Sequence, residues 1–320
     1  MPSLPAIPKV ELHCHLEGIA DPAMVRNIRQ NDPSYPILPE DFEGLYPVET
    51  FDGFIEWWRV VQPVWGQFSP FIPLLLSYVG RAREESVCYL EIMISSSLIP
   101  RDPGQAAETM GSLRRLVDEV ESESIQVEFI ACIPRHRSLE EIKPQATAIH
   151  HLFENGLIAG VSLAGLEQDY PVKPLSRLFA SFNEAGMGIE IHAGEWCGPE
   201  SVRDALDHGF PDRIGHGVSL FQDPDLLDVV LKREIHVEMC PSSNIKTGSV
   251  ARIEDHPVAR ARELGMNFSI NTDDPGIFEN SMTFEFEQLE RVFGFTADDF
   301  RKIYDNSLAA RFKADLKYIS

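Results

Sequence analysis

The stretch that decides the fold is GIEIHAGEWCGPESVRDALDHGFPDRIGH, residues 188–216. It contains two short strand-like runs, Gly188–Ala193 and Arg213–His216. Between them lies Pro199–His208, where a proline at the start and Gly209 after the end are the signals of a helix. A strand, a helix and a second strand in succession predict a βαβ unit, in which the two strands are parallel.

The same alternation extends along the chain in both directions. Glycines that follow several of the expected helices should adopt the left-handed conformation that ends a helix. Apolar residues at helical spacing predict helices at Gln105–Glu121, Leu139–Glu154, Leu175–Ala185, Pro199–His208 and Pro257–Leu264. Eight strands are expected, at Val10–Leu16, Tyr89–Ile94, Val127–Ile133, Gly160–Ala164, Gly188–Ala193, Arg213–His216, His236–Cys240 and Asn267–Asn271.

Eight strands alternating with helices in a chain of 320 residues predict an α/β fold, a closed (β/α)₈ TIM barrel. Residues 1–320 are expected to form one domain, with additional helices after the first strand, where prolines are frequent. The alternative is an open, doubly wound sheet. That fold usually has a glycine-rich turn after its first strand, and this chain has His13-Cys14-His15 there instead.

Composition narrows the class of partner. The formal net charge of −22 disfavours nucleic acid and suits a small neutral or basic substrate. Five scattered cysteines without a C-x-x-C pair favour a reducing compartment, so a cytoplasmic location is expected. The N-terminus lacks the features of a signal peptide, and no apolar run reaches the ~18 residues of a membrane span. The oligomeric state is left open.

Several expected strands end in polar side chains that a buried strand would avoid. In a barrel of this kind the carboxyl ends of all strands meet at one face, where active sites form. His13 and His15 end the first strand, and side chains two residues apart point to the same side. His192 ends the fifth strand and Asp273 the eighth, so three imidazoles and a carboxylate should converge. This ligand set, with room for a water, predicts one catalytic zinc ion per chain.

Three further polar residues are expected beside this metal. Glu195 follows His192 by three residues and could exchange a proton with water or substrate. His216 lies between two glycines, which allow a ligand to approach closely. Asp274 adjoins Asp273, and two neighbouring buried carboxylates need separate partners. Six other histidines are expected to face solvent, namely His136, His150, His151, His208, His236 and His256.

These residues lie in motifs that resemble those of the adenosine deaminase family, the branch of the amidohydrolase superfamily that includes adenosine, AMP and adenine deaminases. The likeness spans nearly the whole chain. Its motifs are, in order, VELHCHLEG near residue 10, VSLAGLE near 161, IHAGE at 191, RIGHG at 213, CPSSN at 240, NTDDP at 271 and NSLAARF at 306. HAGE, GHG and TDDP are highly specific in combination.

The resemblance implies a zinc-dependent aminohydrolase of purine metabolism. Glu195 would protonate N1 of the purine, His216 would orient the attacking water, and Asp274 would hold that water and contact the purine. Gly165 would meet purine N3 through its backbone amide, and Glu17 would contact the substrate at the ribose end. Water would add to C6, ammonia would leave, and a 6-oxopurine would remain. The implied zinc ligands are His13, His15, His192 and Asp273.

Departures from the family pattern bear on the substrate. Adenosine deaminases usually carry LDG where this chain has LEG at residues 16–18, and Ser162 and Leu166 stand where Asp is common. Gly215 is retained where adenine deaminases often have Asp, which favours adenosine or a related nucleoside. Adenine and a 6-aminodeoxyfutalosine-type nucleoside are alternatives. Outside the deaminases, the alternatives are a metal-dependent amide or ester hydrolase and a binding protein without activity.

Overall fold

Eight parallel strands form the centre of the molecule. The computed structural model describes residues 4–32, 34–35, 42–61, 68–120 and 124–313. Neighbouring strands pair in the order β1 to β8, and every pair is parallel. The strands are β1 (Lys9–His15), β2 (Val87–Ser95), β3 (Gln126–Pro134), β4 (Gly160–Ala164), β5 (Gly188–Ala193), β6 (Arg213–His216), β7 (His236–Met239) and β8 (Phe268–Ile270).

The eighth strand meets the first just beyond its own end. Cys14 and Asp273 form a parallel bridge, in which the His15 amide donates to the Asp273 carbonyl at 2.8 Å. In the other direction, the Asp273 amide donates to the His13 carbonyl at 3.1 Å. The predicted (β/α)₈ barrel is therefore confirmed, and the open-sheet alternative is excluded.

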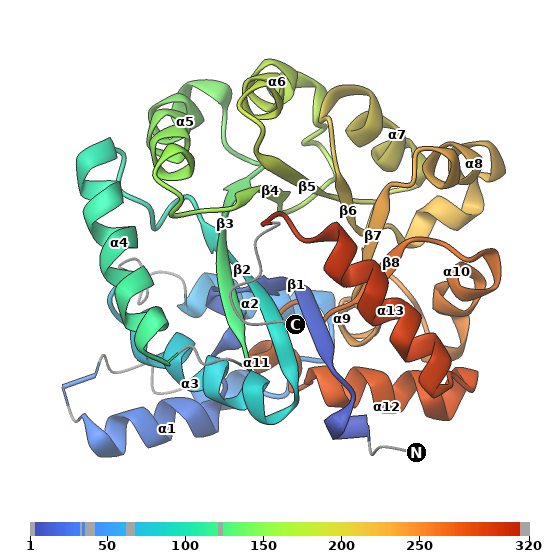
Figure 1. Ribbon diagram of the computed structural model, residues 1–320, viewed down its shortest axis with the longest axis horizontal. Helices are drawn as coiled ribbons and strands as arrows, with labels where there is room; N and C mark the ends of the chain where they lie inside the picture. Colours follow the sequence, from blue (N-terminus) through green and yellow to red (C-terminus); the bar gives the residue numbers. More distant parts are fainter. Residues whose placement is uncertain (1–3, 33, 36–41, 62–67, 121–123, 314–320) are drawn as a thin grey trace.

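Helices surround the strands, and α4 to α8 follow one another as an arc outside them (Figure 1). The helices α1 to α3 lie among the described residues between β1 and β2, which confirms the expected additional helices after the first strand. The helices are α1 (Pro22–Asn31), α2 (Phe51–Val61), α3 (Phe71–Glu84), α4 (Pro103–Val120), α5 (Leu139–Glu154), α6 (Ser176–Glu184), α7 (Pro199–His208), α8 (Pro224–Lys232), α9 (Pro241–Lys246), α10 (Val258–Leu264), α11 (Pro275–Phe278), α12 (Met282–Phe293) and α13 (Ala297–Ala310).

The glycines that end helices do so for two different reasons. Gly156, Gly186 and Gly265 have positive φ values of 66°, 78° and 64°, as expected for left-handed helix ends. Gly209 differs, because its φ is −105°. A Cβ atom there would lie 2.0 Å from Cδ1 of Ile191, so close packing of α7 on β5 requires this glycine.

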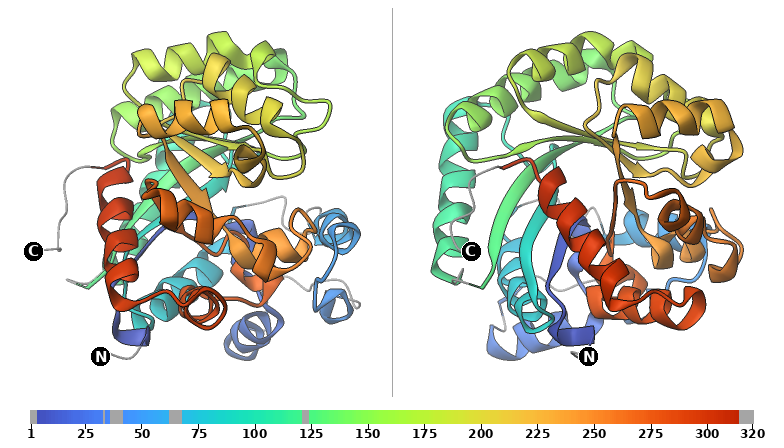
Figure 2. Two further views of the ribbon diagram at one scale, coloured as in Figure 1. Left: turned by 90° about the vertical axis from the view of Figure 1, so that its right-hand side faces the viewer. Right: turned by 45° about the vertical axis from the view of Figure 1, so that its right-hand side comes forward.

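The interior of the barrel is polar at the level below the carboxyl ends of the strands. Arg213 of β6 is fully buried and pairs with Glu91 of β2 and Glu238 of β7, each at 2.6 Å. The end of α13 lies against the strands (Figures 1 and 2), and just beyond it the Phe312 ring covers the guanidinium of Arg213 at 3.4 Å. Branched apolar side chains usually fill this space in such barrels. Buried carboxylates are therefore available directly beneath the candidate site.

Among the described residues, no helix is both long and apolar enough to cross a membrane.

Candidate active site

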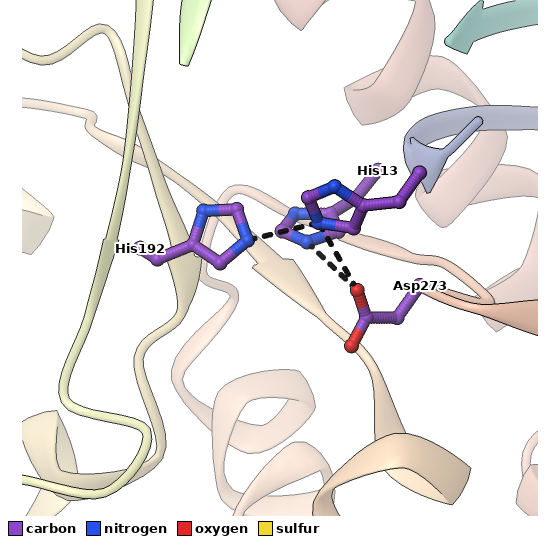
Figure 3. Close-up of side chains that lie close together, drawn as sticks. His13, His192 and Asp273 are labelled. Atoms are coloured by element: carbon purple, nitrogen blue, oxygen red, sulfur yellow. Dashed lines mark hydrogen bonds and ion pairs between the residues drawn. The ribbon is translucent and has the colours of Figure 1, made fainter. Parts of the chain in front are cut away.

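Four predicted metal ligands converge at the carboxyl ends of the strands. His13 and His15 come from β1, His192 from β5, and Asp273 follows β8. Figure 3 shows the side chains of His13, His192 and Asp273 pointing toward one another. Asp273 Oδ1 lies 3.4 Å from Nε2 of His13 and 3.3 Å from Nε2 of His15. The four ligand atoms all lie within 4.8 Å of one another. The arrangement that the sequence predicted is therefore present in the fold.

Local backbone geometry turns the Asp273 carboxylate inward. Asp273 has a φ of 68°, a left-handed conformation that non-glycine residues adopt only when their surroundings fix it. The bridge to Cys14 supplies that constraint. The hydroxyl of Ser243 donates to Asp273 Oδ2 at 2.7 Å, which leaves Oδ1 facing the imidazoles.

The donor set fits a metal ion. His13 Nδ1 lies 2.7 Å from Glu238 Oε2, and His192 Nδ1 lies 3.0 Å from Glu190 Oε1. Because a carboxylate only accepts, each Nδ1 must carry a hydrogen, and each Nε2 is directed at the centre of the cluster. Nε2 of His13 is buried without a hydrogen-bond partner among the described residues. An ion bound by the four side chains would satisfy that atom.

The protonation states of two ligands agree with this fit. Burial lowers the pKa of His15 to about 3 and holds the pKa of His192 well below its ordinary value. Both rings are therefore neutral near pH 7. Their Nε2 atoms lie 3.1 Å apart, so two lone-pair donors are held side by side, as metal ligation requires.

Glu195 lies beside the cluster, and its carboxyl group is buried. Its Oε2 is 3.4 Å from Nε2 of His216, and the hydroxyl of Thr247 lies 3.4 Å from its other oxygen. Burial, the charge of Asp273 and the charge of Glu167 raise the pKa of Glu195 well above its ordinary value. This shift favours the protonated form of Glu195, which can donate a proton.

A second carboxylate, that of Glu167, fixes the backbone that carries Glu195. It accepts from the amides of Gly194 and Glu195, each at 2.7 Å, and from the amide of Trp196 at 3.0 Å. It also accepts from the hydroxyl of Ser201. The glutamate of the VSLAGLE motif thus holds the loop after β5, a role that the sequence analysis did not assign.

The proposed substrate contacts occupy the same end of the barrel. Asp274 is buried, and its Oδ1 has no hydrogen-bond partner among the residues described. Burial, Asp273 and Glu17 raise the pKa of Asp274 well above its ordinary value. Glu17 is 7% exposed, and burial raises its pKa to about 7. Gly165 follows β4 directly with a φ of +102°, which glycine adopts without strain.

Two histidines that were expected to face solvent are instead buried. His236 is 2% exposed in β7, and His256 is 3% exposed after the 3₁₀ helix Ile253–Asp255. The expectation was wrong for both, because partners distant in sequence accommodate their rings. His236 pairs with Asn267 at 2.8 Å, and His256 Nε2 lies 3.2 Å from Asn244 Oδ1.

The surroundings of Gly215 do not support the expected preference for a nucleoside. Gly215 was expected to leave room where adenine deaminases often have Asp. A Cβ atom at Gly215 would instead lie 2.2 Å from Glu190 Oε1 and 3.0 Å from the ring of His13. The space beside Gly215 is therefore filled by the groups beneath the metal ligands.

Comparison with known proteins gives one consistent result. The family model described as adenosine deaminase matches residues 8–317. An adenine deaminase of Rhizobium leguminosarum is 32% identical, and the alignment covers 95% of this chain and 94% of that protein. An aminodeoxyfutalosine deaminase of Acidothermus cellulolyticus is 29% identical over 91% of this chain and 84% of its own length.

Solved structures share the fold. The crystal structure of an adenine deaminase from Arthrobacter aurescens has a TM-score of 0.83 at 24% identity, covering 97% of this chain and 95% of that one. An amidohydrolase from Burkholderia ambifaria with bound Zn has a TM-score of 0.79 at 23% identity, with coverages of 97% and 87%. Together with the match over residues 8–317, these findings show that the chain is a hydrolase belonging to the adenosine deaminase family.

Proposed function

We propose that this protein hydrolyses the 6-amino group of a purine and releases ammonia. One observation carries the proposal, namely that the buried carboxyl group of Glu195, 3.4 Å from His216, lies beside a cluster of three imidazoles and one carboxylate. Hydrolytic deamination of a purine needs a nucleophile at C6 and an acid at a ring nitrogen. The site offers a group for each of these needs.

His13, His15, His192 and Asp273 would hold one zinc ion per chain. Bound zinc supplies Lewis acidity and makes water a nucleophile near neutral pH. Glu190 and Glu238 would orient two of these ligands through their Nδ1 atoms.

The remaining polar residues would act on water and substrate. Glu195 donates a proton to purine N1, which breaks the aromaticity of the ring and lets C6 become tetrahedral. His216, whose pKa burial holds well below its ordinary value, is neutral and orients the attacking water. Asp274 holds the same water and contacts the purine. Gly165 contributes its backbone amide to purine N3.

For the rest of the substrate, adenine has more support than adenosine. The Rhizobium relative, at 32% identity over 95% of this chain, is an adenine deaminase, and the argument from Gly215 no longer favours a nucleoside. Glu17 is nearly enclosed, and a buried carboxyl group suits the N–H groups of a free base. Adenosine and 6-aminodeoxyfutalosine are the competing substrates.

An ammonia-release assay across adenine, adenosine, 2′-deoxyadenosine and 6-aminodeoxyfutalosine tests the proposal. Adenine should have the highest kcat/KM. A nucleoside with a much higher value would contradict the choice of adenine and leave the deaminase chemistry intact. If none of these purines releases ammonia but simple esters or amides are hydrolysed, the deaminase function itself is wrong.

Glu17→Ala tests the specificity contact. An absent partner leaves a buried polar group unpaired, which discriminates strongly between substrates. The variant should raise KM for the preferred purine more than it lowers kcat. An unchanged KM would show that Glu17 does not contact the substrate.

A further inference from the structure

His216 is the residue proposed to orient the attacking water, and its role depends on which ring nitrogen carries the hydrogen. A neutral imidazole has one donor nitrogen and one acceptor nitrogen. Nε2 of His216 faces Glu195, and Nδ1 lies 3.1 Å from the side-chain amide of Asn244. A hydrogen on Nε2 would make His216 a donor toward the reacting groups, whereas a hydrogen on Nδ1 would make it a base.

The backbone amide of Val258 determines which ring nitrogen of a second histidine, His256, carries the hydrogen. The amide N–H of Val258, at the start of α10, donates to Nδ1 of His256 at 3.2 Å. A backbone N–H can only donate, so Nδ1 of His256 must accept. Burial lowers the pKa of His256 to about 3, so the ring is neutral and its single hydrogen is on Nε2.

The hydrogen on Nε2 of His256 determines the orientation of the Asn244 side chain. Nε2 of His256 lies 3.2 Å from the side chain of Asn244 and donates to it, so the Asn244 atom on that side is the oxygen. The other terminal atom of Asn244 is then the NH₂ group, which faces Nδ1 of His216 at 3.1 Å. An NH₂ group can only donate, so Nδ1 of His216 accepts. Asn244, His216 and His256 are all at most 3% exposed.

We infer that Asn244 and His256 are positioning residues that hold His216 in the tautomer with the hydrogen on Nε2. His216 therefore donates a hydrogen bond into the site and does not take a proton from water. A donor preorganised toward the attacking oxygen holds that oxygen in position to add to C6. The backbone of His216, with a φ of 62°, fixes the direction in which that N–H points. The inference deepens the proposed function, but the tautomer itself can be observed without turnover.

The direct test is NMR of protein labelled with ¹⁵N-histidine, in which long-range ¹H–¹⁵N correlations distinguish the two tautomers. The His216 signals are assigned as those that disappear in His216→Gln. In the wild-type protein, Nε2 of His216 should carry the hydrogen. A hydrogen on Nδ1 would overturn the inference whether or not the protein deaminates purines. Absence of ammonia release with the expected tautomer would instead overturn the proposed function alone.

Asn244→Asp replaces the NH₂ group that donates to Nδ1 of His216 by an oxygen that can only accept. The carboxylate still accepts from His256, but it also accepts on the other side, so Nδ1 of His216 must now carry a hydrogen. We expect that change in the spectrum and a fall in kcat of about 10²–10³-fold, the loss typical of removing one oxyanion donor. An unchanged His216 tautomer, or an unchanged kcat with the tautomer reversed, would contradict the assigned role.

A matched control and a conservative variant separate this role from a general effect on folding. Asn267→Asp changes an Asn–His pair outside the site, because the half-buried Asn267, before β8, places its Oδ1 2.8 Å from Nδ1 of His236. An aspartate there still accepts, so the His216 spectrum and kcat should not change. His256→Gln retains a donor toward Asn244 and should preserve the tautomer, whereas His256→Leu should not. Equal spectra for these two His256 variants would overturn the proposed chain of hydrogen bonds.

Discussion

Replacing Glu167 by glutamine should weaken the hydrogen bonds that hold the loop carrying Glu195, while the barrel stays folded. One oxygen of Glu167 accepts from the amides of Glu195 and Trp196, and the other accepts from the amide of Gly194 and the hydroxyl of Ser201. An amide group in place of the second oxygen leaves only one backbone donor unsatisfied, since the Ser201 hydroxyl can rotate. We therefore expect the glutamine to place its NH₂ group beside the Gly194 amide and the Ser201 hydroxyl. The free energy of unfolding should fall by about 1–3 kcal/mol.

Glu167→Gln should also lower the rate of catalysis. A displacement of a catalytic group by about 1 Å can lower the rate about 10²-fold, so kcat should fall by about that factor with little change in KM. The charge of Glu167 also helps to raise the pKa of Glu195. Without that charge, Glu195 loses its proton at a lower pH, and the alkaline limb of the kcat profile should move to lower pH.

Steady-state kinetics across pH and chemical denaturation measure these effects. Glu200→Gln is the matched control, because Glu200 is an exposed residue that accepts from the nearby Gly198 amide, at 3.1 Å. This control should keep wild-type kcat and stability. If Glu167→Gln behaves like the control, or lowers only stability, then Glu167 does not position Glu195.

Two further variants test individual buried carboxyl groups. Glu195→Gln should retain the metal, because Glu195 is not among the proposed ligands, and should lose about 10²–10⁴-fold in kcat as expected for a general acid; near-normal turnover measured by ammonia release would assign N1 protonation to another group. Glu285→Gln should alter the pH dependence of stability, because burial raises the pKa of Glu285 from 4.5 to about 7. The stabilising contribution of protonated Glu285 is complete below about pH 4.5 and is lost as pH rises through 7, a change of about 3 kcal/mol that the glutamine variant lacks. Denaturation at several pH values should therefore show the variant gaining on the wild type as pH rises, and a constant difference between them would contradict the raised pKa.

The fold and the ligand set followed from features that are local in the sequence. Strand-length runs, helix-ending glycines and polar residues at strand ends were sufficient to predict the barrel and the convergence of His13, His192 and Asp273. Strand ends are informative because a polar residue there is rare unless the chemistry of the site uses it. Strand boundaries differ from the prediction by one or two residues, as where β2 begins at Val87 and β7 ends at Met239, and these differences did not move any site residue.

The groups that support the ligands could not be found in this way. Glu238 accepts from His13, which lies 225 positions earlier in the sequence. In the sequence alone, nothing distinguishes Glu238 from other polar residues in strands. His256 has no motif of its own, and its burial depends on Asn244 and the Val258 amide. Gly215 was misinterpreted because the sequence does not show that Glu190 fills the space beside it. Such pairings depend on the register between strands, which a linear pattern does not specify.

The metal content of the purified protein tests the central claim most directly. Elemental analysis should find about one zinc per chain in the wild type. His15→Ala should lose both the zinc and the release of ammonia from 6-aminopurines, because His15 supplies one of the four converging ligand atoms. A wild-type protein that deaminates at its full rate with no bound metal, or a His15→Ala variant that keeps both zinc and activity, would contradict the account.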